Sequence, residues 1–161
     1  PMPPFTHREP GLIGAAFDHP GVTAELICDG VHVAPAMVRA AFRLFSAERI
    51  VLISDSMRAT GLDDGDYTLG GQSVHVHGNR ATLADGTLAG SVTNLRDCLR
   101  NAVAFGIPLA DAVQAAAVNP VRVIGESDRL GSLEPGKLAN MVLLDKSLNV
   151  VKVFIKGKSM V

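Results

Sequence analysis

The feature that most constrains the fold is an unbroken apolar run, Ile50-Val51-Leu52-Ile53, with Asp55 just beyond it. A short run rich in β-branched residues predicts a strand that is buried on both faces, as in a parallel sheet. Asp55 would then lie at the carboxyl end of that strand. In parallel α/β folds this edge carries the chemistry, because the strand is rigid and the following loop is free to vary. Asp55 is therefore a candidate acid or base, although an aspartate also suits an ordinary turn here.

A second predicted strand, residues 23–28, comes before it and is followed by Asp29-Gly30-Val31-His32. The segment between the two strands, residues 35–46, has apolar residues at helical spacing behind Pro35, which suits a first helical turn. Strand, helix and strand form a βαβ unit, in which both strands end at the same edge. We therefore expect His32 and Asp55 to face one pocket, with a purely structural histidine as the alternative.

The chain opens on a loop, because three prolines among residues 1–4 suit neither a helix nor a central strand. This loop carries His7, Arg8 and Glu9. They form either a solvated charged loop or an anion site, since the planar guanidinium of arginine suits phosphate or carboxylate. A short helix is predicted next, over residues 12–18.

Residues 62–84 predict short antiparallel strands joined by glycine turns. His75 and His77 alternate with valines in this region. They are either a metal-binding pair on one strand face or a solvent-facing row, and no third ligand stands near them in the sequence.

The rest of the chain predicts two helices and a small β unit. The loop DGTLAGS, residues 85–91, leads into a helix with Ser91 as its N-cap and Gly106 at its end. A second helix starts at Pro108, and Asn119-Pro120 is predicted to break it. Residues 130–161 alternate turns with β-rich runs and carry a hairpin turn at residues 156–158. The fold class is therefore α/β.

Composition excludes several classes of function. Lys and Arg number 15 against 16 Asp and Glu, for a net charge of −1, so there is no basic field for nucleic acid or anionic lipid. Cys28 and Cys98 lie in apolar segments without CxxC spacing, which predicts buried thiols of a reducing compartment. Neither a transmembrane-length apolar run nor a signal peptide is present, so we expect a cytoplasmic protein.

Several stretches resemble, in order, the amidohydrolase superfamily and within it the N-acetylglucosamine-6-phosphate deacetylase family: PMPPFTHREPG, ICDGVHVAP, VLISDSMRATG, DGTLAGS, the NP of AAAVNPVRVIG, and LGSLEPGKLANMVLLD. The last two are common among amidohydrolases, whereas the first three are specific to the deacetylases. The resemblance implies a (β/α)8 TIM barrel beside a small β-sandwich. Residues 1–128 would supply the last two barrel strands, with a β-hairpin insertion at about 62–84, and residues 129–161 part of the sandwich.

The resemblance also implies a reaction, the metal-dependent hydrolysis of N-acetylglucosamine 6-phosphate to glucosamine 6-phosphate and acetate. Asp55 matches the catalytic acid and base of the family, and His32 matches a residue that contacts the sugar and the reacting amide. Arg8 matches an arginine that binds phosphate in a neighbouring subunit's site, which implies a homodimer. The remaining substrate contacts would come from Pro1, Leu88, Ala89 and Gly90.

The family's divalent metal, zinc or iron, is held by a glutamate and two histidines, which would lie upstream of Pro1. We therefore expect this chain to be the C-terminal part of a protein more than twice as long, to bind no metal on its own and to be inactive when isolated. Two alternatives stay open. One is a non-catalytic fragment that keeps the sugar-phosphate contacts. The other is a different amidohydrolase, such as a dihydroorotase-like enzyme or a deaminase, for which the Arg8 loop would have no use.

Overall fold

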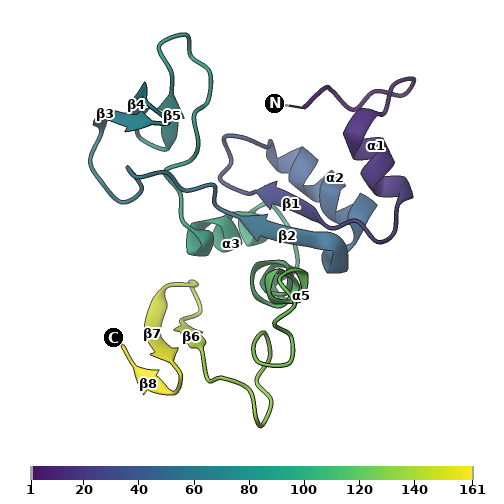
Figure 1. Ribbon diagram of the computed structural model, residues 1–161, viewed down its shortest axis with the longest axis vertical. Helices are drawn as coiled ribbons and strands as arrows, with labels where there is room; N and C mark the ends of the chain where they lie inside the picture. The colour runs from purple at the N-terminus through teal and green to yellow at the C-terminus, as the bar shows by residue number, and fades with distance from the viewer. Residues whose placement is uncertain (1, 161) are drawn as a thin grey trace.

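The centre of the fold is a pair of parallel strands, β1 (Ala24–Ile27) and β2 (Ile50–Ile53). The structure is a computed structural model that describes residues 2–160. Helix α2 (Pro35–Phe45) and the short 3-10 turn η1 (Ala47–Arg49) connect the two strands (Figure 1). The strands pair in register from Ala24 opposite Ile50 to Ile27 opposite Ile53, so both end at the same edge. The predicted βαβ unit and the α/β class are confirmed.

The helices pack against one face of this strand pair. Helix α2 turns Val38, Phe42 and Phe45 into the core, the i, i+4, i+7 spacing of one helix face. Beside it lie α3 (Leu95–Ala104), α4 (Leu109–Val113), η2 (Gln114–Val118) and α5 (Asn119–Val123), of which α3 and α5 are labelled in Figure 1. One buried apolar cluster contains residues of α2, α3, α4 and η2 together with Leu26, Ile50 and Leu52, which alternate along the strands and so share a face.

Arg49 fastens the first helix, α1 (Gly11–Asp18), to this core. Its guanidinium donates to the backbone carbonyls of Ala16, Phe17 and His19, at the end of α1, and to that of Val22. The last carbonyls of a helix lack partners within the helix, and a cation there also meets the negative end of the helix dipole. The guanidinium lies 5.1 Å from the centre of the Phe45 ring, which links α1 to α2 as well.

The start of α3 corrects one prediction. Its N-cap is Asn94, whose side chain accepts a hydrogen bond from the backbone N–H of Asp97, and not Ser91. Ser91 is buried and pairs with Ser56 in an isolated parallel bridge. Its backbone is thus committed to an extended conformation, and the helix can begin only after it.

The expected helix break at Asn119-Pro120 is also wrong. Residues 109–123 run as one helical rod, in which η2 is a π-helical turn between α4 and α5. The backbone N–H of Asn119 donates to the carbonyl of Gln114, five residues earlier. The wider turn lets Pro120, which has no N–H and a bulky ring, sit in the first turn of α5 without ending the rod.

Two three-stranded antiparallel sheets flank the centre, and each matches a predicted β region. The first contains β3 (Gly65–Leu69), β4 (Gln72–His77) and β5 (Arg80–Thr82), and the second contains β6 (Met141–Leu144), β7 (Val150–Ile155) and β8 (Lys158–Ser159). Lys156 and Gly157 both have positive φ between β7 and β8, as a two-residue hairpin turn requires. The division at residues 128 and 129 stays a prediction. Among the described helices, none is long and apolar enough to cross a membrane.

Asn119 offers a direct test of how α5 is attached to the sheet. Its side chain is completely buried, and its Nδ2 donates to the carbonyls of Ala47 (2.7 Å) and Ile50 (2.6 Å). Asn119→Asp replaces this donor with a carboxylate oxygen that faces two carbonyl oxygens. We expect the free energy of unfolding, measured in urea, to fall by about 3 kcal/mol or more.

Asn140→Asp is the matched control. Asn140 is exposed and uses Oδ1 to accept from the backbone N–H of Lys156, so a carboxylate keeps that hydrogen bond. We expect its unfolding curve to stay within about 0.5 kcal/mol of wild type. Equal curves for the two variants would contradict the role given to Asn119.

The two thiols give a second test. Burial raises the pKa of Cys28 to about 12, with smaller contributions from Cys98 and Asp29, and burial also raises the pKa of Cys98. A raised pKa keeps a thiol protonated and therefore unreactive at pH 8. We expect Ellman's reagent to label neither cysteine in the native chain and both in guanidinium. Rapid labelling without denaturant would show that the two thiols are not held in a closed core.

Candidate active site

Two aspartates occupy equivalent places at the carboxyl edge of the parallel strands. Ile27 and Ile53 are the last paired residues, and Asp29 and Asp55 each follow two positions later. Loops at this edge are where parallel α/β proteins place reactive groups. The backbones of the two strands therefore end side by side, as predicted.

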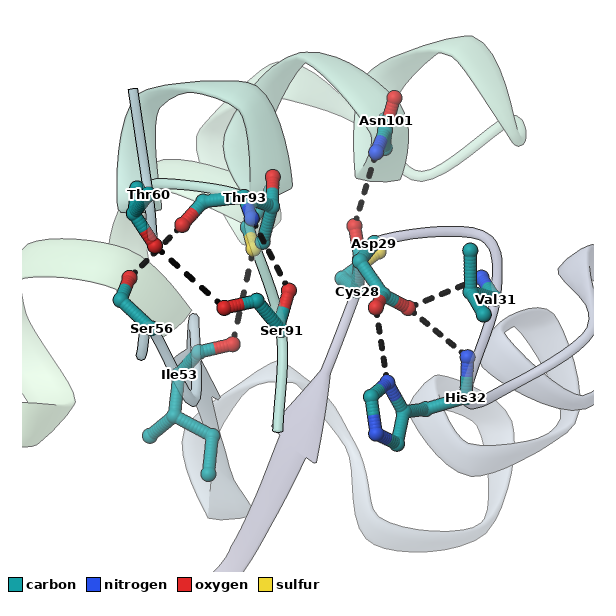
Figure 2. A network of polar contacts seen from close by, with 11 residues as sticks. Cys28, Asp29, Val31, His32, Ile53, Ser56, Thr60, Ser91, Thr93 and Asn101 are labelled. Carbon is teal, nitrogen blue, oxygen red and sulfur yellow. Dashed lines mark hydrogen bonds and ion pairs between the residues drawn. The ribbon is translucent and has the colours of Figure 1, made fainter. Parts of the chain in front are cut away.

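Helix α3 closes this edge from one side. The side chain of Asn101 donates to the carbonyl of Cys28 (3.0 Å), and the thiol of Cys98 lies 3.5 Å from the carbonyl of Ile53 (Figure 2). These carbonyls end β1 and β2, where the ladder can no longer satisfy them. One helix thus fixes both strand ends.

Asp55 is exposed and has an unusual backbone conformation. Its φ is +51°, in the left-handed region that only glycine and, less often, Asn and Asp adopt easily. The conformation is supported by a hydrogen bond from the N–H of Ser91 to the carbonyl of Asp55 (2.9 Å). Backbone conformations of this kind cluster at functional sites, although Ser46, Leu148 and Lys156 adopt them elsewhere in this chain.

The loop of Leu88, Ala89 and Gly90 lies directly beside Asp55. Ala89 N–H donates to the carbonyl of Ala81 (3.0 Å) in β5, and the next residue but one, Ser91, holds Asp55 as described. Gly90 has φ +71°, and a Cβ there would lie 3.6 Å from the carbonyl oxygen of Asp55. The structure therefore brings Asp55 and this loop together.

Several hydroxyl groups connect the segment that follows β2 with the segment that precedes α3. Ser56 donates to the carbonyl of Thr93 (2.7 Å) and lies 2.8 Å from the hydroxyl of Ser54, while Thr60 donates to the carbonyl of Ser91 (3.3 Å; Figure 2). These contacts tie the segment after β2 to the loop before α3. Sequence reasoning did not predict these hydrogen bonds, because a serine or threonine in a loop gives no indication of its partner.

His32 is paired with Asp29. Its Nδ1 lies 2.7 Å from Asp29 Oδ2, and Asp29 Oδ1 accepts from the backbone N–H groups of Val31 and His32, both at 2.9 Å (Figure 2). Burial alone would raise the pKa of Asp29, but the hydrogen bonds from His32 and Val31 outweigh it and lower that pKa below its usual value. Asp29 was not predicted as a site residue. The spacing of three residues between Asp29 and His32 is the sequence feature that could have predicted their contact.

A polar pocket of about 310 Å³ adjoins this pair. It is lined by Asp29, Gly78, Asn79, Val92, Thr93, Asp97 and Asn101. The turn between β4 and β5 thus reaches the end of β1. His32 and Asp55 are not among the lining residues, so the expectation that both face one pocket is not met by this cavity.

Arg8 is not brought to these groups. It lies in an exposed loop, which is closed by hydrogen bonds between Thr6 and Glu9. The predicted contact of Pro1 falls outside the described residues. The expected roles of Asp55, His32 and Arg8 remain predictions.

His75 and His77 follow the solvent-facing alternative. Their side chains are exposed, and each pairs with one aspartate, His75 with Asp66 (2.9 Å) and His77 with Asp64 (2.8 Å). Nowhere in residues 2–160 are three or more His, Cys, Asp or Glu side chains grouped so that they could hold a metal ion.

Comparison with known proteins agrees with this geometry. The model of the amidohydrolase family matches residues 14–160. An N-acetylglucosamine-6-phosphate deacetylase of Bacillus subtilis is 41% identical over 157 residues, which are 97% of this chain and 40% of that protein. An N-acetylgalactosamine-6-phosphate deacetylase of Escherichia coli is 43% identical over 153 residues, 94% of this chain and 40% of the relative.

A solved structure extends the likeness to three dimensions. The N-acetyl-D-glucosamine-6-phosphate deacetylase of Mycobacterium smegmatis, crystallised as a variant with N-acetyl-D-glucosamine-6-phosphate, is 40% identical and superposes with a TM-score of 0.92. The match covers 98% of this chain and 42% of that one. This chain therefore spans about two fifths of the length of these relatives. Because the family model matches nearly the whole of it, the chain belongs to the amidohydrolase family.

Proposed function

We propose that this chain forms the proton-transfer and substrate-binding part of a deacetylase that hydrolyses N-acetylglucosamine 6-phosphate to glucosamine 6-phosphate and acetate. One observation carries the proposal: Asp55, in a strained conformation at the end of a parallel strand, lies against the loop of residues 88–90. The M. smegmatis relative, crystallised with this sugar phosphate, supports the choice of substrate.

Asp55 would act as both base and acid. As a carboxylate it takes a proton from the water that attacks the acetamide carbonyl, and it returns that proton to the nitrogen as the C–N bond breaks. Water and amide thus become acetic acid and amine, which at neutral pH are acetate and the ammonium ion, and Asp55 ends as the carboxylate it was. Asp55 is exposed, so both water and substrate can reach it.

Substrate binding would be shared among the other candidates. The backbone of residues 88–90 would close over the sugar, and His32 would contact it beside the reacting amide. In a homodimer, Arg8 would bind the phosphate of the substrate in the neighbouring subunit's site, which is consistent with the exposure of Arg8. The divalent metal of the family, zinc or iron, does not fit the described residues, because they contain no group of ligands for it.

The proposed architecture follows the same likeness. We propose that β1 and β2 are the last two strands of a TIM barrel and that β6, β7 and β8 belong to a small β-sandwich. The match to the deacetylase structure, with a TM-score of 0.92, supports this assignment.

The runner-up is a non-catalytic chain that keeps the sugar-phosphate contacts. We expect the chain alone, with or without added zinc or iron, to release no acetate from N-acetylglucosamine 6-phosphate. Proton transfer by a carboxylate typically supplies only about 10²- to 10⁴-fold acceleration, which is too little for amide hydrolysis. Acetate release by the metal-supplemented chain would contradict this expectation.

The role of Asp55 can be tested in a chimera, in which this chain replaces the matching 40% of the B. subtilis relative. We expect Asp55→Asn to lower kcat by about 10²- to 10⁴-fold with little change in KM, because it removes the proton acceptor and keeps the shape. Asp128→Asn, at an exposed turn, is the control and should keep full activity. An active Asp55→Asn chimera would rule out this mechanism.

Arg8 distinguishes sugar phosphates from other amidohydrolase substrates. We expect Arg8→Gln to weaken binding of N-acetylglucosamine 6-phosphate by about tenfold and to leave binding of N-acetylglucosamine unchanged, because only the first carries a phosphate. Arg43→Gln, on the exposed face of α2, is the matched control. Calorimetric titration of the chimera measures both. No dependence on Arg8 would favour a phosphate-free substrate, and tighter binding of N-acetylgalactosamine 6-phosphate would reassign the sugar.

A further inference from the structure

Among residues 2–160, Asp29 is the one buried carboxylate at the strand edge, and the proposed reaction leaves it without a task. We propose that Asp29 is a positioning residue: it holds His32 in the tautomer that carries hydrogen on Nδ1, so that Nε2 offers a lone pair to a hydrogen-bond donor of the substrate. The inference deepens the proposed function and rests on it for the statement that His32 meets substrate.

The geometry restrains both partners. Asp29 Oδ1 accepts from two backbone N–H groups at 2.9 Å, and Oδ2 lies 2.7 Å from His32 Nδ1. The carboxylate side chain is 2% exposed and the imidazole 19% exposed. Neither oxygen can turn away without breaking a hydrogen bond in a place that water barely reaches, which makes the arrangement rigid.

Chemistry then dictates the tautomer. An ionised carboxylate can only accept hydrogen bonds, so the atom facing Oδ2 must carry the hydrogen. The lowered pKa of Asp29 keeps it ionised at neutral pH. A neutral imidazole has one N–H, so Nε2 is left with its lone pair. No residue among 2–160 is bonded to Nε2, which leaves it available to a hydroxyl or amide N–H of an acetylated amino sugar.

The hairpin provides a natural comparison. His75 and Asp66 form the same kind of pair at 2.9 Å, but their side chains are 64% and 78% exposed. Water competes for both groups there, and the imidazole is free to exchange tautomers. The buried pair is therefore distinguished by its surroundings rather than by its contact distance.

The test is Asp29→Asn in the chain, read by two-bond ¹⁵N–¹H correlation spectra of the histidine rings well above the usual histidine pKa of about 6.5. Asn Oδ1 can keep both backbone hydrogen bonds, while Nδ2 can only donate to His32. The hydrogen should then move from Nδ1 to Nε2. Asp66→Asn is the matched control and should leave the His32 signals unchanged.

Binding adds a functional readout in the same proteins. We expect Asp29→Asn to weaken binding of N-acetylglucosamine 6-phosphate by about tenfold, since a ring that presents N–H cannot accept from the substrate. Asp66→Asn should bind as tightly as wild type. A merely structural role for Asp29 would lower stability without exchanging the tautomer.

The tautomer of His32 decides whether the inference holds. Hydrogen on Nε2 of His32 in the wild-type chain would overturn the inference, even if Asp29→Asn fails to fold. An unchanged tautomer in folded Asp29→Asn would also overturn it. The wild-type chain could also carry hydrogen on Nδ1 of His32 and yet bind no sugar phosphate. That result would support the positioning role of Asp29 and count against the proposed function.

Discussion

The parallel pairing of β1 with β2 is the constraint on which the rest of the structure depends. It brings two strand ends to one edge and leaves their last carbonyls without partners in the ladder. Asn101 and Cys98 of α3 approach those carbonyls, so the helix that completes the core also sets the position of the loops that follow the strands. The candidate site therefore shares its rigidity with the core, although Asp55, its proposed acid and base, is exposed to solvent.

The elements that could be predicted from sequence are those whose signals are local. An apolar run predicts β2, helical spacing predicts α2, and Lys156-Gly157 predicts the last hairpin. The hydrogen bonds that position the candidate site join residues far apart in the sequence. Asn119 reaches Ile50 across 69 positions and Asn101 reaches Cys28 across 73, and no local pattern reports such a partner. The same limit explains Ser91, whose capping propensity is overridden by its pairing with Ser56.

The residues with proposed roles differ in how firmly the structure holds them. His32 is locked to a buried aspartate, and Asp55 is held through its backbone by Ser91. Arg8, in contrast, stands in an exposed loop. This difference is consistent with the proposed roles, because a group that orients a reacting bond needs such restraint, whereas a charged group in a loop can move to meet a phosphate.

The π-helical turn of η2 places a side chain through its winding rather than through its composition. Its residues are Gln-Ala-Ala-Ala-Val, yet the extra residue in the turn sets the direction in which Asn119 leaves the rod. If the same residues wound as a regular α-helix, every side chain after the turn would be rotated by about 100° around the axis. Asn119 would then face away from β2. The wide turn, and not the alanine side chains within it, therefore points Asn119 at the sheet.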